Sequence, residues 1–148
     1  MGEFVERDVY RILDAAANRG REALRVIEDA VRFLGDDAEL ARAVKEARHR
    51  FSATADKLDR GKRLAARDVG GDVGTEIEAS GEYRRGSLDE ILRANFARLQ
   101  EAARSLEEFS KLAAPELARE WERIRYEAYA LESLAHRFAF KASQKRSR

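Results

Sequence analysis

The sequence predicts an all-α protein: a four-helix bundle made of two related helical hairpins, joined by a glycine-rich crossover loop. Three observations predict this fold class. Apolar residues recur at helical spacing over four long stretches, glycine or proline separates those stretches, and the two halves of the chain resemble each other. With 148 residues, the chain has room for one domain and one core.

The first helix is expected over residues 7–34, because its apolar side chains recur in steps of three and four and form one stripe from Leu13 to Leu34. Gly35 and the two aspartates that follow it are expected to end this helix and cap the next one. The second helix is expected over residues 38–58, where a similar stripe runs from Leu40 to Leu58.

Residues 60–86 interrupt the helical pattern and are rich in glycine. A long irregular loop in a compact domain is more often functional than idle. Ser87 and Glu90 then have the spacing of a capping box, which opens a third helix over residues 87–113. Pro115 is tolerated in a first helical turn, so the fourth helix is expected over residues 115–142. Residues 143–148 are basic and are expected to form a disordered tail behind a single domain of residues 1–142.

An internal repeat relates the two halves. Glu22 in the segment 21–29 aligns with Glu101 in the segment 100–108, at a separation of 79 residues. Arg48 aligns with Arg125 at a separation of 77 residues. The change of two residues falls in the hairpin turn, where a length difference costs little. The repeat predicts that the first and third helices are equivalent about a pseudo-twofold axis and turn their polar faces toward one shared site.

Composition excludes several classes of function. Charged residues make up 39% of the chain, but 29 basic and 28 acidic side chains leave a net charge of only +1, so a nucleic-acid binder is not expected. The absence of cysteine excludes disulfides and thiolate metal sites. No apolar run is long enough for a membrane span, and the start of the chain does not resemble a signal peptide. We therefore expect a cytoplasmic protein without a membrane partner.

The densest polar face lies on the first helix, around Asn18, Arg21 and Arg25. Arginine side chains clamp phosphate oxygens with paired hydrogen bonds, and carboxylates hold Mg²⁺, which bridges phosphates. The competing interpretation is a solvated face with ion pairs between neighbouring turns. Asn18 and Gly20 are poor helix formers in the middle of this helix, where the glycine alone costs about 1 kcal/mol. They indicate a constraint from function or from close packing.

The segment 67–75 is the second candidate, because its glycines expose backbone N–H groups to an anion. It lacks the lysine and the strand context of a Walker A loop, and an ordinary flexible crossover is the alternative. His136 is interpreted as structural, since it lies near the end of the fourth helix, where a cation is favourable. For His49, a core position and a contact with substrate both stay open.

Five segments together resemble the small helical hydroxymethylpyrimidine-phosphate kinases of thiamine biosynthesis, a family that occurs alone or fused to thiamine phosphate synthase. The resemblance covers nearly the whole chain and departs from the expected residues at Ala16 and Gly20. The segments are RILDA at 11–15, NRGREALRVIED at 18–29, RHR at 48–50, ARDVGGDVGT at 66–75 and ANFARLQEAARSLEE at 94–108. The synthase itself is a βα barrel, which this chain has neither the pattern nor the length to form.

The resemblance implies phosphorylation of 4-amino-5-hydroxymethyl-2-methylpyrimidine phosphate to the diphosphate with ATP and Mg²⁺. The residues expected to take part in catalysis are Arg25, Arg67, Asp72 and Arg104. Those expected to bind substrate are Asn18, Arg21, Arg48, His49, Gly74, Thr75, Asn95, Arg98 and Gln100. The carboxylates expected to hold Mg²⁺ are Glu22, Glu28, Asp29, Glu101 and Glu107.

Two other classes of function stay open. One is a non-catalytic helical module that associates with thiamine phosphate synthase, and it predicts no nucleotide binding. The other is a different small helical enzyme for an anionic substrate, which predicts an arginine-lined pocket without a metal requirement. A homo-oligomer is also left open, since a duplicated hairpin can complete its bundle alone or by pairing.

Overall fold

The computed structural model describes residues 3–79 and 82–146. These residues form helices joined by turns and irregular segments and contain no strand, which confirms the all-α prediction. The elements are α1 (Glu3–Asp29), a π-helical turn η1 (Ala30–Leu34), α2 (Ala38–Ala55), α3 (Arg60–Ala66), α4 (Leu88–Ala113), a 3-10 turn η2 (Pro115–Leu117) and α5 (Ala118–Arg146).

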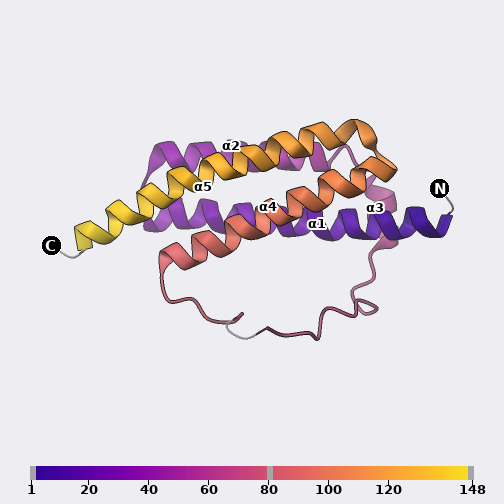
Figure 1. Ribbon diagram of the computed structural model, residues 1–148, viewed down its shortest axis with the longest axis horizontal. Helices are drawn as coiled ribbons and strands as arrows, with labels where there is room; N and C mark the ends of the chain where they lie inside the picture. The colour runs from indigo at the N-terminus through magenta and orange to yellow at the C-terminus, as the bar shows by residue number, and fades with distance from the viewer. Residues whose placement is uncertain (1–2, 80–81, 147–148) are drawn as a thin grey trace.

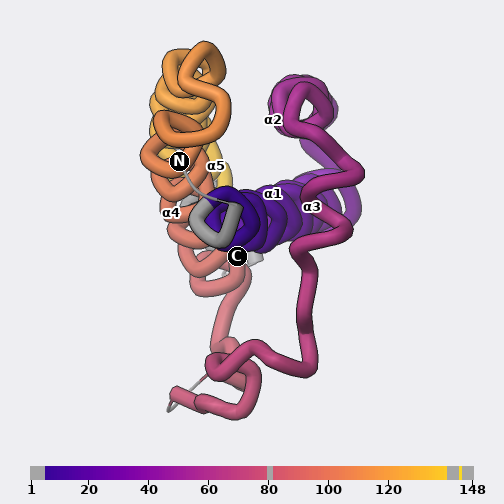
Figure 2. Tube along the Cα trace, turned by 90° about the vertical axis from the view of Figure 1, so that its right-hand side faces the viewer, coloured from indigo at the N-terminus to yellow at the C-terminus, as the bar shows by residue number. Residues whose placement is uncertain are grey.

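The four long helices contact one another in a closed ring. α1 packs against α4 and α2, and α5 packs against α4 and α2 (Figure 1). Figure 2 shows α2 and α5 on the side of α1 and α4 that is opposite the irregular segment after α3. The interior of the ring is apolar, and its largest fully buried side chains include Trp121, Phe51, Phe96, Leu13 and Leu24. The relation of the two hairpins as a duplicated unit stays a prediction.

Several helix boundaries differ from those predicted. α1 begins at Glu3 rather than near residue 7, and α2 ends at Ala55 rather than at 58. α5 continues to Arg146, so residues 143–146 are helical and not a disordered tail. Residues 147 and 148 lie outside the described part of the chain.

The helix α3 was not predicted, because residues 60–66 were assigned to the irregular crossover. Its N-cap is Asp59, whose carboxylate accepts a hydrogen bond from the Lys62 backbone N–H at 2.9 Å. The cap and the run of arginine, lysine, leucine and alanine residues outweigh the cost of Gly61 in the first turn. The irregular segment therefore begins only at Arg67.

The other caps agree with the sequence. Asp37 caps α2 by accepting from the Leu40 N–H at 2.9 Å. Ser87 caps α4 by accepting from the Glu90 N–H at 3.2 Å, while the Glu90 carboxylate accepts from the Gly86 N–H at 2.5 Å rather than from Ser87. Pro115 lies in the first turn of η2, where its missing N–H costs nothing.

Gly20 is explained by close packing. A Cβ atom at this position would overlap the aromatic ring of Phe51, which is fully buried on α2. The same ring meets Trp121 of α5 edge to face, with a centroid separation of 5.1 Å. Of the two constraints that the sequence left open for Gly20, the structure provides the packing one, because the missing side chain lets α2 approach α1.

Candidate functional site

Glu28 is a buried carboxylate at the contact between α1 and α2. Its side chain is 4% exposed, and its Oε2 atom accepts a hydrogen bond from Arg48 Nε of α2 at 2.6 Å. Arg25, one turn earlier on α1, lies 3.8 Å from the same oxygen and is half exposed. A buried carboxylate requires such partners, because an unpaired charge in the interior is costly. We call Arg25, Glu28 and Arg48 the α1 triad.

Glu107 forms the corresponding cluster at the contact between α4 and α5. Its side chain is 6% exposed and accepts from Arg125 Nε at 2.9 Å and from Arg104 at 3.0 Å. The hydrogen bond from Arg125 to Glu107 is the main reason why the pKa of that guanidinium is raised. We call Arg104, Glu107 and Arg125 the α4 triad. Its members align with those of the α1 triad at the separations of 79 and 77 residues found in the sequence.

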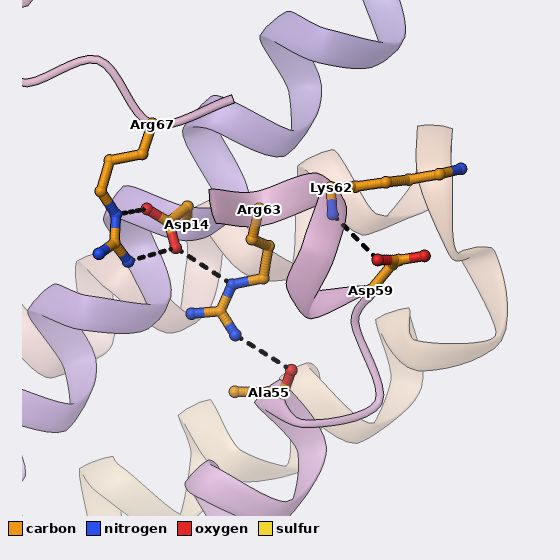
Figure 3. A network of polar contacts seen from close by, with 6 residues as sticks. All are labelled: Asp14, Ala55, Asp59, Lys62, Arg63 and Arg67. Atoms are coloured by element: carbon orange, nitrogen blue, oxygen red, sulfur yellow. Dashed lines mark hydrogen bonds and ion pairs between the residues drawn. The ribbon is translucent and has the colours of Figure 1, made fainter. Parts of the chain in front are cut away.

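A third cluster, which the sequence analysis did not select, surrounds Asp14 (Figure 3). The Asp14 carboxylate is buried and accepts from Arg67 Nε at 2.6 Å, from Arg67 Nη2 at 2.9 Å and from Arg63 Nε at 3.2 Å. Arg63 also donates to the backbone carbonyl of Ala55 at 3.4 Å. One carboxylate thus ties the end of α2, the helix α3 and the start of the irregular segment to α1.

Burial by itself raises the pKa of the Asp14 carboxyl, but the hydrogen bond from Arg67 and the charges of Arg67 and Arg63 outweigh it and hold the pKa below its usual value. The sequence places Asp14 directly after the core residue Leu13, at the edge of the buried stripe. Its partners Arg63 and Arg67 come from a distant segment, which helical spacing does not relate to it.

The irregular segment carries four of the predicted site residues, of which only Arg67 has a recorded side-chain contact with a helix. Asp72 accepts from the Gly74 N–H at 2.8 Å, and Thr75 donates its hydroxyl to the Asp72 carbonyl at 2.9 Å. All described residues from 67 to 79 are exposed, and the segment runs apart from the helices in both views (Figures 1 and 2). Its predicted closure over phosphates stays a prediction.

The remaining predicted residues fall into two groups. Asn18 is half-buried, whereas Arg21, Glu22 and Asp29 of α1 and Arg98 and Glu101 of α4 are exposed. The amides of α4 have partners inside the protein: Asn95 donates to the Ile91 carbonyl at 2.8 Å, and Gln100 donates to Glu132 of α5 at 3.0 Å. These two side chains therefore stabilise α4 and its contact with α5.

The five predicted magnesium ligands are not gathered into one group. Over the described residues, no three histidine, cysteine, aspartate or glutamate side chains lie close enough together to hold a metal ion. Glu28 and Glu107 are instead occupied by arginines in the two triads. Glu22, Asp29 and Glu101 are exposed. The magnesium assignment stays a prediction.

An open groove of about 650 Å³ lies between the end of α1 and α2. Its lining includes Glu28 of the α1 triad, the cations Arg32 and Lys45, and His49. His49 is thus exposed at a groove rather than buried in the core, so a ligand in the groove can reach it. Its contact with substrate stays a prediction. His136 lies elsewhere, 3.6 Å from Asp89 of α4.

Comparison with known proteins identifies the family. Residues 11–134 match the ThiD2 family. The chain belongs to the ThiD2 family. It is 44% identical over 131 residues to a thiamine-phosphate synthase of Nostoc punctiforme, which covers 88% of this chain and 36% of that protein. It is 40% identical over 124 residues to that of Rhodopirellula baltica, with 84% and 33% covered, and 42% identical over 130 residues to that of Gloeobacter violaceus, with 88% and 37% covered.

This ThiD2 chain spans about a third of the length of these relatives. No solved structure matches it. Within residues 3–79 and 82–146, none of the helices combines the length and the apolar character that a membrane span requires.

Proposed function

We propose that this chain is a helical domain of thiamine biosynthesis that binds a phosphorylated pyrimidine and phosphorylates it with ATP. The observation that carries the proposal is the row of arginine side chains beside one face of α1, Arg21, Arg25 and Arg67, in a chain of the ThiD2 family. Guanidinium groups bind phosphate oxygens with paired hydrogen bonds, and these arginines keep N–H donors that no described residue uses.

The reaction would transfer the terminal phosphoryl group of ATP to a phosphate oxygen of 4-amino-5-hydroxymethyl-2-methylpyrimidine phosphate. A new P–O–P linkage forms, the bond to the β-phosphate of ATP breaks, and ADP leaves. The acceptor oxygen is already anionic at neutral pH, so positioning and charge neutralisation suffice and no strong general base is needed. This requirement agrees with a surface rich in arginine and poor in histidine and free of cysteine.

Exposed carboxylates of this chain would hold a magnesium ion, which would neutralise charge on the phosphates of ATP. Mg²⁺ in such sites takes one or two protein carboxylates and completes its shell with phosphate oxygens and water. Glu22 and Glu101 fit this need, because both are exposed and they occupy equivalent positions on α1 and α4. Glu28 and Glu107 fit it less well, since arginines already use their oxygens.

The second candidate function is a non-catalytic module that supports thiamine-phosphate synthase. The comparisons favour it, because the similar proteins reported above bear that enzyme's name and this chain matches about a third of each. In that case the two triads would hold the helices together, and the exposed surface would contact the synthase. Such a module would change the rate or stability of the synthase and would not consume ATP.

One experiment separates the two candidates. The protein is mixed with ATP, Mg²⁺ and the pyrimidine monophosphate, and ADP and the pyrimidine diphosphate are measured by chromatography. A parallel sample contains the unphosphorylated pyrimidine alcohol, which would leave the phosphate-binding arginines unpaired and is expected to react poorly. Formation of the diphosphate supports the kinase. Its absence, together with a faster or more stable synthase when this chain is added, supports the module.

A further inference from the structure

We infer that the phosphorylated ligand binds to the α1–α2 hairpin and that the related α4–α5 hairpin does not bind it. The inference rests on the proposed function for the identity of the ligand, and it assigns that ligand to one half of the molecule. The two triads are equivalent in position, but the polar groups around them differ in how fully they are paired within the protein.

On α4, the polar groups neutralise one another. Arg104 contacts two carboxylates, Glu107 and Glu108, each at 3.0 Å. Glu108 is also bonded by Lys111 at 2.7 Å, and this contact is the main reason that its pKa is lowered. Gln100, one turn before Arg104, is uncharged and bonded to Glu132. An incoming phosphate would have to break these pairs before it could bind.

On α1, the equivalent positions are paired less completely. Arg21 replaces Gln100 and makes no hydrogen bond or ion pair with any residue that the structure describes. Arg25 replaces Arg104 and has one carboxylate at 3.8 Å instead of two at 3.0 Å. Asp29 replaces Glu108 and has no ion pair within the described residues, so it does not neutralise Arg25. The α1 face therefore offers the guanidinium group of Arg21, which has no partner among the described residues, and that of Arg25, whose contact with Glu28 is long.

Arg21 and Arg25 lie between the two buried carboxylates of α1, Asp14 and Glu28. Arg21 is seven residues from Asp14 and seven from Glu28, which is about 10 Å along the helix in each direction. The steps of four and three residues from Asp14 through Asn18, Arg21 and Arg25 keep these side chains on one face of α1. Arg67, bound to Asp14 and 41% exposed, adds a cation at one end of this row.

The other end of the row opens into the groove described above. Glu28 belongs both to the α1 triad and to the lining of this groove, whose volume of about 650 Å³ is in the range of small-molecule sites. Carboxylates of Asp36, Asp37 and Glu46 line the groove together with three cations, Arg32, Arg42 and Lys45. The carboxylates could accept hydrogen bonds from an amino group on a ring. The arrangement suits a ligand with a phosphate at Arg21 and Arg25 and an aminopyrimidine-type ring in the groove.

The test uses inorganic diphosphate with Mg²⁺ as the probe, titrated into the full chain by calorimetry. Arg21→Gln gives α1 the residue that α4 already has, and Arg104→Gln is the matched change on α4. Arg21→Gln is expected to weaken diphosphate binding about tenfold to a hundredfold, the loss of one or two charge-assisted hydrogen bonds. Arg104→Gln is expected to change diphosphate binding less than about twofold, because Glu107 and Glu108 already neutralise Arg104; the catalytic role that the sequence predicts for Arg104 would then not extend to binding this ligand. Circular dichroism on each variant establishes that the helices are retained.

Three outcomes overturn the inference: no diphosphate binding by the unmodified chain, no effect of Arg21→Gln in a folded protein, or equal weakening by Arg104→Gln. The probe requires no turnover, so the inference and the proposed function fail in different ways. Binding that depends on Arg21 without any kinase product would leave the inference standing and remove the kinase. If the kinase product forms and the KM for the pyrimidine monophosphate depends on Arg104 and not on Arg21, the kinase is supported and the inference is wrong.

Discussion

The α1–α2 and α4–α5 hairpins share a buried Arg–Glu–Arg triad but differ in how they fill the space between their helices. In the first, Gly20 of α1 makes room for the large ring of Phe51 on α2. At the corresponding positions of the second, Leu99 is large and Ala128 is small, and both are buried. The polar contact is the same in both hairpins, whereas the sizes of the neighbouring apolar residues are reversed. Each hairpin is therefore packed to fit its own partner helix, and the two halves are not interchangeable.

The exchange of sizes predicts the largest effect on stability. Phe51→Ala should lower the free energy of unfolding by about 4 kcal/mol, because it leaves a large cavity beside Trp121. Gly20→Leu should lower it by a similar amount or prevent folding, because the new side chain overlaps the Phe51 ring. The double variant recreates the Leu99 and Ala128 arrangement and should be more stable than the sum of the two losses implies.

Urea unfolding of the four proteins in this cycle measures the coupling between the two positions. If the double variant is more stable than the summed single losses predict by about 1 kcal/mol or more, residues 20 and 51 pack against each other as proposed. Strictly additive losses would mean that positions 20 and 51 do not affect each other's packing. Gly61→Ala is a useful control for a glycine in an exposed helical turn, and we expect it to be neutral or slightly stabilising.

Asp14 should give the next largest effect, because α4 has no equivalent carboxylate: the aligned position is Arg93. Asp14→Asn should lower the free energy of unfolding by about 3 kcal/mol, since it leaves the buried Arg63 guanidinium without its counter-charge. The half-exposed Arg67 contributes less to this loss, because water screens its charge. Chemical denaturation measures the change.

The same residue predicts a pH dependence. The pKa of Asp14 is lower in the folded chain than in the unfolded chain, so its stabilisation is fully present above the unfolded pKa of about 4 and is lost as the pH falls through the folded value. The stability difference between the unmodified chain and Asp14→Asn should therefore shrink below about pH 4. A difference that stays constant down to pH 2 would contradict the assigned ion pair.

The triads predict a smaller and matched pair of effects. Glu28→Gln and Glu107→Gln should each lower the free energy of unfolding by about 2 kcal/mol, because each leaves one half-buried arginine, Arg48 or Arg125, without its carboxylate. Equal losses would support the equivalence of the two hairpins in the fold. Thermal unfolding under one set of conditions compares the two variants directly. Losses that differ by more than twofold would contradict the equivalence of the two triads.

The smallest effect on stability should come from Arg25→Ala, which removes a half-exposed side chain with one distant carboxylate and should cost less than about 1 kcal/mol. Under the proposed function, its activity should nevertheless fall by at least about tenfold. The matched variant Arg104→Ala should keep its activity as long as it stays folded. Near-normal turnover of folded Arg25→Ala would remove Arg25 from the site.

The sequence predicted the helical architecture well, because the steps of three and four apolar residues report directly on the buried face of each helix. The hairpin turn shows the limit of that method. Gly35 was expected to supply the conformation that ends the helix, yet the left-handed residue is Asp36, with φ of 48°, and Gly35 is required because a side chain there would overlap Phe138 of α5. A contact between residues so far apart in the chain produces no pattern in the local sequence.

The candidate site was predicted less completely. Residues 21–29 and their repeat were recognisable because charged side chains at helical spacing share a face. Which of those charges are already paired depends on partners from another helix, as with Arg48 for Glu28 and Glu132 for Gln100, and helical spacing cannot reveal these. Asp14 was missed for the same reason, since both of its arginines come from a segment assigned to an irregular loop.

The exposed segment between α3 and α4 has a consequence for how the chain can be divided. The two hairpins adhere through the packing of α1 on α4 and of α2 on α5, and the crossover adds little to that adhesion. A single cut among residues 69–79 should therefore yield two fragments that stay together and co-elute in size-exclusion chromatography, whereas separate elution would show that the covalent link is needed. The protein would then behave as a heterodimer of two hairpins that happen to be encoded as one chain.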